Sequence, residues 1–178
     1  ITAKPANTAH VLINVQNSSN QYSHGIYRST NSGDSWTETN FNPTNTGEGG
    51  LGTTFRIYDI EYHPTIPNLV FVGTNKGLYR SNDDLQTWTQ MFNPAEISQF
   101  TFHPTNANIM YAYDSRSANG NRNKVYISND AGLTWNFTND IAANSNQTAL
   151  ISASAACPDC LFFQSNNGVW KSLDQGAN

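Results

Sequence analysis

One eight-residue phrase occurs three times in this 178-residue chain and starts a fourth time near its end. It reads Ser-x-Asp-x-Gly-x-Thr-Trp with small variations, and the fourth copy stops before its Trp. Self-similarity with a period of about 45 residues is typical of repeat architectures and restricts the fold more than any other feature. The defining positions are Ser29, Asn31, Gly33 and Trp36; Ser81, Asp83 and Trp88; Ser128, Asp130, Gly132 and Trp135; and Ser172, Asp174 and Gly176.

Each copy follows a short strand-like phrase, such as Gly25–Arg28 or Gly77–Arg80. Further upstream, a His-Pro-Thr phrase at His63 and at His103 precedes an apolar run. The repeat therefore reads as four short strands separated by a Pro/Asn turn, a Gly turn and an Asp-containing turn. Four strands per period are the signature of a β-propeller blade. Because both histidines fall at the same repeat position, we expect them to shape a turn rather than to bind metal.

The repeated phrase is suited to a tight turn between two strands. Asp and Ser side chains accept hydrogen bonds from backbone N–H groups, and Gly adopts a positive φ. Asn31 replaces Asp in the first copy, and Leu85 replaces Gly in the second, so we expect the second turn to differ in backbone geometry. A calcium loop on Asp83, Asp130 and Asp174 is the alternative. Each turn offers too few carboxylates for the six to eight oxygens that calcium takes, so we expect neither metal nor cofactor.

These units resemble Asp-box (BNR) repeats, which occur in sialidases, xyloglucanase-type glycoside hydrolases, sortilin-type receptors and photosystem-assembly propellers. The Pro-Asn turns are most similar to those of the xyloglucanase-like and sortilin-like branch. The resemblance implies a β-propeller in which the boxes are structural turns at the blade edges.

The repeats predict an all-β fold, a single domain that is a partial β-propeller of four-stranded antiparallel blades. We expect the first repeat to lack its innermost strand and the last to stop before its outermost. Because propellers close with about 4–8 blades, we expect the chain to be part of a longer one. The remainder of that propeller, or a partner chain, would complete it. The expected blades span approximately residues 1–42, 55–92, 95–138 and 148–178.

Composition narrows the class of protein. Only 12% of residues are charged and the net charge is -4, which argues against nucleic-acid binding. No apolar run approaches the roughly 18 residues of a membrane span. The abundance of neutral polar residues favours a secreted or cell-surface protein. Cys157 and Cys160 are the only cysteines, and a single CxxC pair leaves open a local disulfide or two free thiols.

Asp59 is the candidate catalytic residue. It shares one face of an expected strand with Glu61. The resemblance supports this choice, because xyloglucanase-like enzymes have a catalytic Asp in a similar Asp-Ile phrase near the channel. We expect Gln99 and Ser152 at the corresponding positions of the next two repeats, so neither supplies a second carboxylate. The alternative role of Asp59 is to accept hydrogen bonds near the channel.

Non-repeating loops on a repeat scaffold are where binding usually occurs. The candidates are Tyr22, His24, the glycine-rich segment 47–52, and Arg116 and Arg122 in a polar insertion. The leading hypothesis is a non-catalytic binding or scaffold module that engages a protein or glycan partner through such loops. The alternatives are a segment of a secreted polysaccharide hydrolase, and a secreted cargo protein or surface adhesin.

Overall fold

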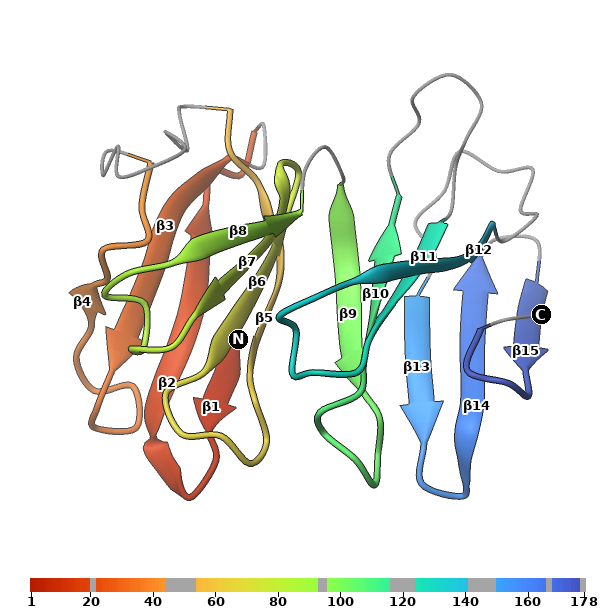
Figure 1. Cartoon of the computed structure of the whole chain (residues 1–178). Helices are drawn as coiled ribbons and strands as arrows, with labels where there is room; N and C mark the ends of the chain where they lie inside the picture. The colour runs from red at the N-terminus through yellow and green to blue at the C-terminus, as the bar shows by residue number, and fades with distance from the viewer. Residues whose placement is uncertain are drawn as a thin grey trace. The chain divides into compact units, whose positions relative to one another are not determined.

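The computed structural model describes residues 1–19, 22–43, 54–92, 96–115, 124–140, 150–165 and 168–176. In these residues every regular element is a β-strand, and within each sheet a strand pairs antiparallel with its neighbours in sequence (Figure 1). The prediction of an all-β chain of propeller blades is therefore confirmed. The chain divides into two compact units, Ile1–Asn93 and Pro94–Asn178.

The first unit contains two four-stranded sheets, with the orders β1-β2-β3-β4 and β5-β6-β7-β8. The first sheet corrects one expectation, because the first repeat does have an innermost strand. That strand, β1, is only three residues long and has no apolar alternation, so its sequence carries no strand signal. The strands are β1 (Thr2–Lys4), β2 (Asn7–Gln16), β3 (Ser23–Ser29), β4 (Thr37–Glu38), β5 (Ile57–Tyr62), β6 (Val70–Thr74), β7 (Gly77–Ser81) and β8 (Thr89–Phe92).

The second unit contains a four-stranded sheet of order β9-β10-β11-β12 and a three-stranded sheet of order β13-β14-β15. Every residue of β6 and of β10, the second strands of their sheets, is buried. Strands covered on both faces read as continuous apolar runs, which is how these two appear in the sequence. The strands are β9 (Ile97–Phe102), β10 (Met110–Asp114), β11 (Lys124–Ser128), β12 (Asn136–Asp140), β13 (Leu150–Ser154), β14 (Cys157–Ser165) and β15 (Gly168–Ser172).

Each unit has its own hydrophobic core. In the first unit, Phe41 packs edge-to-face on Tyr79 and on Trp88, with ring centroids 5.4 and 5.0 Å apart. Trp88 is the Trp of the second box, so this repeated side chain anchors its turn to the blade. In the second unit the core includes Tyr111, Tyr113, Val125, Ile151, Leu161 and Phe163.

The second and third boxes form the same hydrogen-bonded turn. The Ser81 hydroxyl donates to Asp83 Oδ1 (2.9 Å) and accepts from the Leu85 N–H (2.8 Å). Asp83 also accepts from the backbone N–H and the hydroxyl of Thr87, at 2.8 and 2.6 Å. Burial alone would raise the pKa of the Asp83 carboxyl, but these hydrogen bonds outweigh it and lower the pKa. In the third box the equivalent bonds join Ser128, Asp130, Gly132 and Thr134 at 2.8, 2.9, 2.8 and 2.6 Å.

The fourth and fifth positions of every box have positive φ. Leu85, at the fifth position, has a φ of 64°, so the expectation of a different backbone there was wrong. A left-handed non-glycine residue costs about 1–2 kcal/mol. Leu85 is only 1% exposed, and burying a Leu side chain contributes about 1.5–3 kcal/mol, enough to offset that cost.

The fourth position docks each box onto its own blade. Its backbone N–H donates to a carbonyl near the start of the second strand. The acceptor lies two residues before that strand in the second and third blades, and is the third residue of the strand in the first and last blades. This one bond therefore joins the loop after the third strand to the start of the second strand. The four bonds run from Ser32 to Ala9, Asp84 to Asn68, Ala131 to Asn108 and Gln175 to Asp159, at 2.9, 3.0, 2.9 and 2.9 Å.

His63 and His103 organise the turns that carry two of these carbonyls. His63 Nδ1 accepts from the N–H groups of Thr65 (3.2 Å) and Ile66 (3.0 Å). His103 Nδ1 accepts in the same way from Thr105 and Asn106 at 3.3 and 3.1 Å. An accepting Nδ1 carries no proton, so both rings act as turn clamps, as their shared repeat position predicted.

Asp84 links the two sheets of the first unit. Its side chain is buried and accepts a 2.5 Å hydrogen bond from the Tyr62 hydroxyl. Burial lowers the pKa of His10, while the Asp84 charge acts in the opposite direction. The basic groups around Asp84 Oδ2 are His10 Nε2, Arg28 Nε and Lys4 Nζ, at 3.0, 3.5 and 3.8 Å.

Replacing Asp130 with Ala should destabilise the protein by about 2 kcal/mol, because several charge-assisted hydrogen bonds of the third turn are lost. Burial opposes the shift, but hydrogen bonds lower the pKa of Asp130, so its contribution exists above the unfolded pKa and is lost as the pH falls. Urea denaturation at pH 7 and pH 3 measures both effects. The exposed Asp34→Ala is the matched control, and an equal loss in both variants would contradict the prediction.

Replacing Asp84 with Asn should cost about 3 kcal/mol, because Lys4 and Arg28 would lose their partly buried counter-charge. Denaturant unfolding of Asp84→Asn beside Asp34→Asn measures the difference. A loss below about 0.5 kcal/mol, the range of ordinary surface substitutions, would show that Asp84 does not hold the sheets together.

Candidate functional site

A mainly polar cavity of about 370 Å³ lies within the first unit where β1 and β2 meet β5. Asn14 spans the two sheets there, because its Nδ2 donates to the Ile57 carbonyl (3.3 Å) and its Oδ1 accepts from the Ser23 hydroxyl (2.6 Å). These bonds fix one wall of the cavity. It is lined by Ile1, Thr2, Asn14, Gln16 and the six residues of β5.

The local geometry of β5 places both of its carboxylates in this cavity. The ladder to β6 pairs Ile57 with Thr74 and Asp59 with Gly73, so Tyr58 is the extra residue of a β-bulge. After the bulge the strand alternates regularly. Asp59 and Glu61 therefore share one face, and both are half-buried.

Burial, followed by the negative charge of Asp59, raises the pKa of Glu61 from 4.5 to about 7. At neutral pH a large fraction of Glu61 is therefore a protonated acid that can donate a hydrogen bond, beside a second carboxyl group. A carboxyl group whose pKa is raised by burial and by a neighbouring carboxylate is a candidate for an acid–base or binding site. Sequence reasoning placed Glu61 on the same face as Asp59 but did not identify it as a site residue.

Strand register identifies the positions equivalent to Asp59 in the second unit. Counting three residues from the start of the apolar run in the second strand leads to Tyr113 in one sheet and to Gln164 in the other. Their partners in the first strand of each sheet are Gln99 and Leu150. Leu150, and not Ser152, is thus the equivalent of Asp59 in the last sheet. Ser152, the position expected from the sequence, lies two residues further along β13 and pairs with Phe162. Gln99 Oε1 accepts from the Ile151 N–H (2.7 Å), which joins β9 to β13.

The other sequence candidates do not line this cavity. Tyr22 is half-buried, and the Arg56 guanidinium lies over its ring, 5.2 Å from the centroid. His24 is exposed on β3. Arg116, Arg122 and the glycine-rich segment 47–52 lie outside the described residues.

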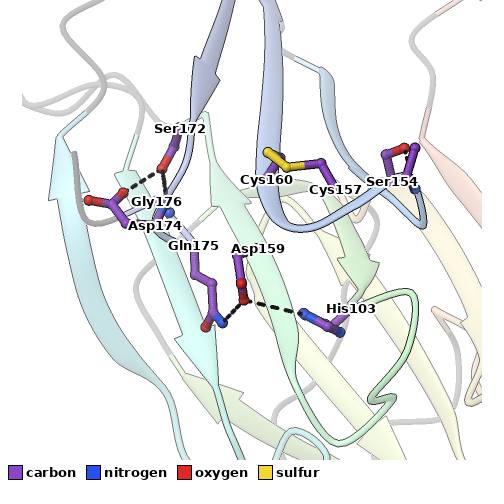
Figure 2. Close-up of a disulfide and its surroundings, with 10 residues drawn as sticks. His103, Ser154, Cys157, Asp159, Cys160, Ser172, Asp174, Gln175 and Gly176 are labelled. Carbon is purple, nitrogen blue, oxygen red and sulfur yellow. Dashed lines mark hydrogen bonds and ion pairs between the residues drawn. A yellow bond between two sulfur atoms is a disulfide. The ribbon is translucent and has the colours of Figure 1, made fainter.

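Cys157 and Cys160 form a disulfide at the start of β14 (Figure 2). In the part of the chain that the structure describes, no group of three or more His, Cys, Asp or Glu side chains could hold a metal ion. Nor do those residues include a helix with the length and hydrophobicity to span a bilayer.

Comparison with known proteins agrees with the repeated turns and blades seen in the structure. A sequence model of the Sortilin-Vps10 family, described as sortilin, neurotensin receptor 3, matches residues 24–167. The chain belongs to this family. No curated protein matches the chain by sequence.

Solved structures share the fold. An ancestral GH74 enzyme is 23% identical with a TM-score of 0.69, and the match covers 100% of this chain and 25% of that one. The GH74 xyloglucanase of Xanthomonas campestris is 14% identical with a TM-score of 0.72, covering 98% and 28%. YCF48 from Cyanidioschyzon merolae is 10% identical with a TM-score of 0.58, covering 96% and 53%. The chain spans about a quarter of the length of these GH74 enzymes and shares the fold of that part.

Replacing Glu61 with Gln should stabilise the protein at pH 8 by a few degrees in Tm and have little effect at pH 4. The folded pKa of about 7 lies above the unfolded value, so the favourable contribution of protonated Glu61 is complete below about 4.5 and is lost as the pH rises through 7. Thermal unfolding at pH 4, 6 and 8 measures the trend, with the exposed Glu38→Gln as control. A Tm difference that does not change with pH would refute the buried-acid interpretation.

Proposed function

We propose that the chain is a non-catalytic binding or scaffold module of a secreted or cell-surface repeat protein, and that it engages a protein or glycan partner. The observation that carries this proposal is that Asp59 and Glu61 lie on one face of a single strand. Both carboxyl groups therefore reach a ligand from the same side. Glycoside hydrolysis needs two carboxyl groups that flank the scissile bond, which this pair does not provide by itself.

The lining of the cavity supports a ligand rich in hydrogen-bonding groups. Gln16 and the Asp59–Glu61 pair offer amide and carboxyl groups, and Tyr58 at the rim has an exposed fraction of 36%. A few convergent polar groups beside an aromatic ring suit a sugar or a polar peptide segment.

Three observations support a location outside the cell and a protein or peptide partner. The Cys157–Cys160 disulfide favours an oxidising compartment, such as the cell exterior. The matching family is described by the name of a receptor. YCF48, one of the proteins that share the fold, has also been solved bound to the D1 peptide.

A second candidate function is that of a segment of a polysaccharide hydrolase. It is favoured by the pKa of Glu61, which at about 7 suits a general acid, and by the neighbouring Asp59. In this case the carboxyl group that completes the pair with Asp59 or Glu61 would come from outside these strands.

Calorimetric titration with xyloglucan oligosaccharides and with a library of polar peptides separates the two functions. We expect saturable binding of at least one probe, weakened tenfold or more by Asp59→Asn and by Glu61→Gln, because each removes a charged or donating group from the cavity. Glu38→Gln serves as the matched control and should bind like the wild type. We expect no release of reducing ends.

If the wild-type protein releases reducing ends and both cavity variants abolish this release, the hydrolase function would replace the binding proposal. Binding that neither variant weakens would show that the cavity is not the ligand site.

A further inference from the structure

The fourth blade closes its first turn in a different way from the second and third blades. In the third blade His103 stands five residues before Asn108, whose carbonyl receives the docked box. In the fourth blade the residue five places before the docking carbonyl of Asp159 is Ser154. Its hydroxyl accepts from the Ala156 N–H (3.3 Å), whereas the His103 imidazole accepts from two N–H groups.

The disulfide stands where this turn otherwise has a hydrogen bond. In the third blade the Ile109 N–H donates to the Asn106 carbonyl (2.9 Å), and in the second blade Leu69 donates to Ile66 (3.4 Å). The equivalent positions in the fourth blade are Cys160 and Cys157, which are covalently joined. A covalent bond therefore closes the same four-residue turn that an imidazole clamp and a backbone hydrogen bond close elsewhere.

Asp159 lies inside this four-residue ring and holds the fourth box by two bonds (Figure 2). Its carbonyl accepts from the Gln175 N–H (2.9 Å), and its Oδ1 accepts from Gln175 Nε2 (2.8 Å). The same Oδ1 lies 4.0 Å from Nε2 of His103, in the turn that follows β9. The turn around Asp159 thus connects the fourth box to the third blade.

We propose that the Cys157–Cys160 disulfide is a redox-sensitive clamp that controls the docking of the fourth box, residues 172–176, on its blade. A dithiol reductant attacks the half-buried Cys157 sulfur, because the Cys160 sulfur belongs to a fully buried residue. The S–S bond breaks, Cys160 leaves as a thiolate and takes up a proton, and a mixed disulfide forms on Cys157. The second thiol of the reductant then displaces Cys157, so that two cysteine thiols and an oxidised reductant result.

Reduction has a local consequence because the fourth turn has no imidazole to hold it. Without the ring constraint, Asp159 no longer presents its carbonyl and carboxylate together to Gln175. Box 172–176 then undocks, and β15 loses the support at its end.

Hydrogen–deuterium exchange of the protein with and without dithiothreitol tests the clamp. We expect reduction to accelerate exchange at the Gln175 and Gly176 amides at least tenfold, while the Leu85 amide of the second box is unchanged. Cys157→Ser should reproduce the acceleration without reductant, and reductant should add nothing further. His63→Ala, the matched variant of an imidazole-clamped turn, should accelerate Leu85 instead, equally with and without reductant.

Three results would overturn the proposal. Unchanged exchange at Gln175 after complete reduction would show that the ring does not hold the box. Acceleration throughout the chain would show a general stabilising crosslink instead of a local clamp. Alkylation of both cysteines in the unreduced native protein would show that the disulfide does not form.

Discussion

The backbone hydrogen bond from the fourth box position to the carbonyl near the start of the second strand is the interaction on which every blade depends. It requires two consecutive residues with positive φ, and the Ser and Asp side chains of the box hold them there by accepting turn N–H groups. The copies offset the conformational free-energy cost of positive φ at the fifth position in different ways. Three boxes use Gly at the fifth position, and the second uses a buried Leu85.

Since the backbone of the fourth position does the docking, its side chain is free to differ between blades. Asp84 uses this freedom to bring a carboxylate among Lys4, His10 and Arg28 and so to join two sheets of the first unit. Gln175 uses it to bind the Asp159 carboxylate within the disulfide ring. The same turn is thus both a fixed structural part and a place where individual blades acquire specific contacts.

The candidate site, in contrast, lies at a position where the repeats differ in sequence. Asp59 has Gln99 and Leu150 as its equivalents, and Gln99 serves to join adjacent sheets. Only in the second blade, among the described strands, does this position place a carboxylate beside another in a polar cavity. The chemistry of the pair suits a ligand contacted from one side, which is why we propose binding and not hydrolysis.

The sequence by itself determined the repeat, the four-stranded blades and the turn roles of His63 and His103, because periodic hydrophobicity and turn residues are local signals. Tertiary structure decided what depends on distant contacts. Strand β1 exists through pairing with β2, Leu85 keeps its left-handed backbone through burial, and Cys157 and Cys160 meet through the turn geometry. The pKa of Glu61 was likewise beyond the sequence, because the burial that raises it arises only when β1, β2 and β5 come together around one cavity.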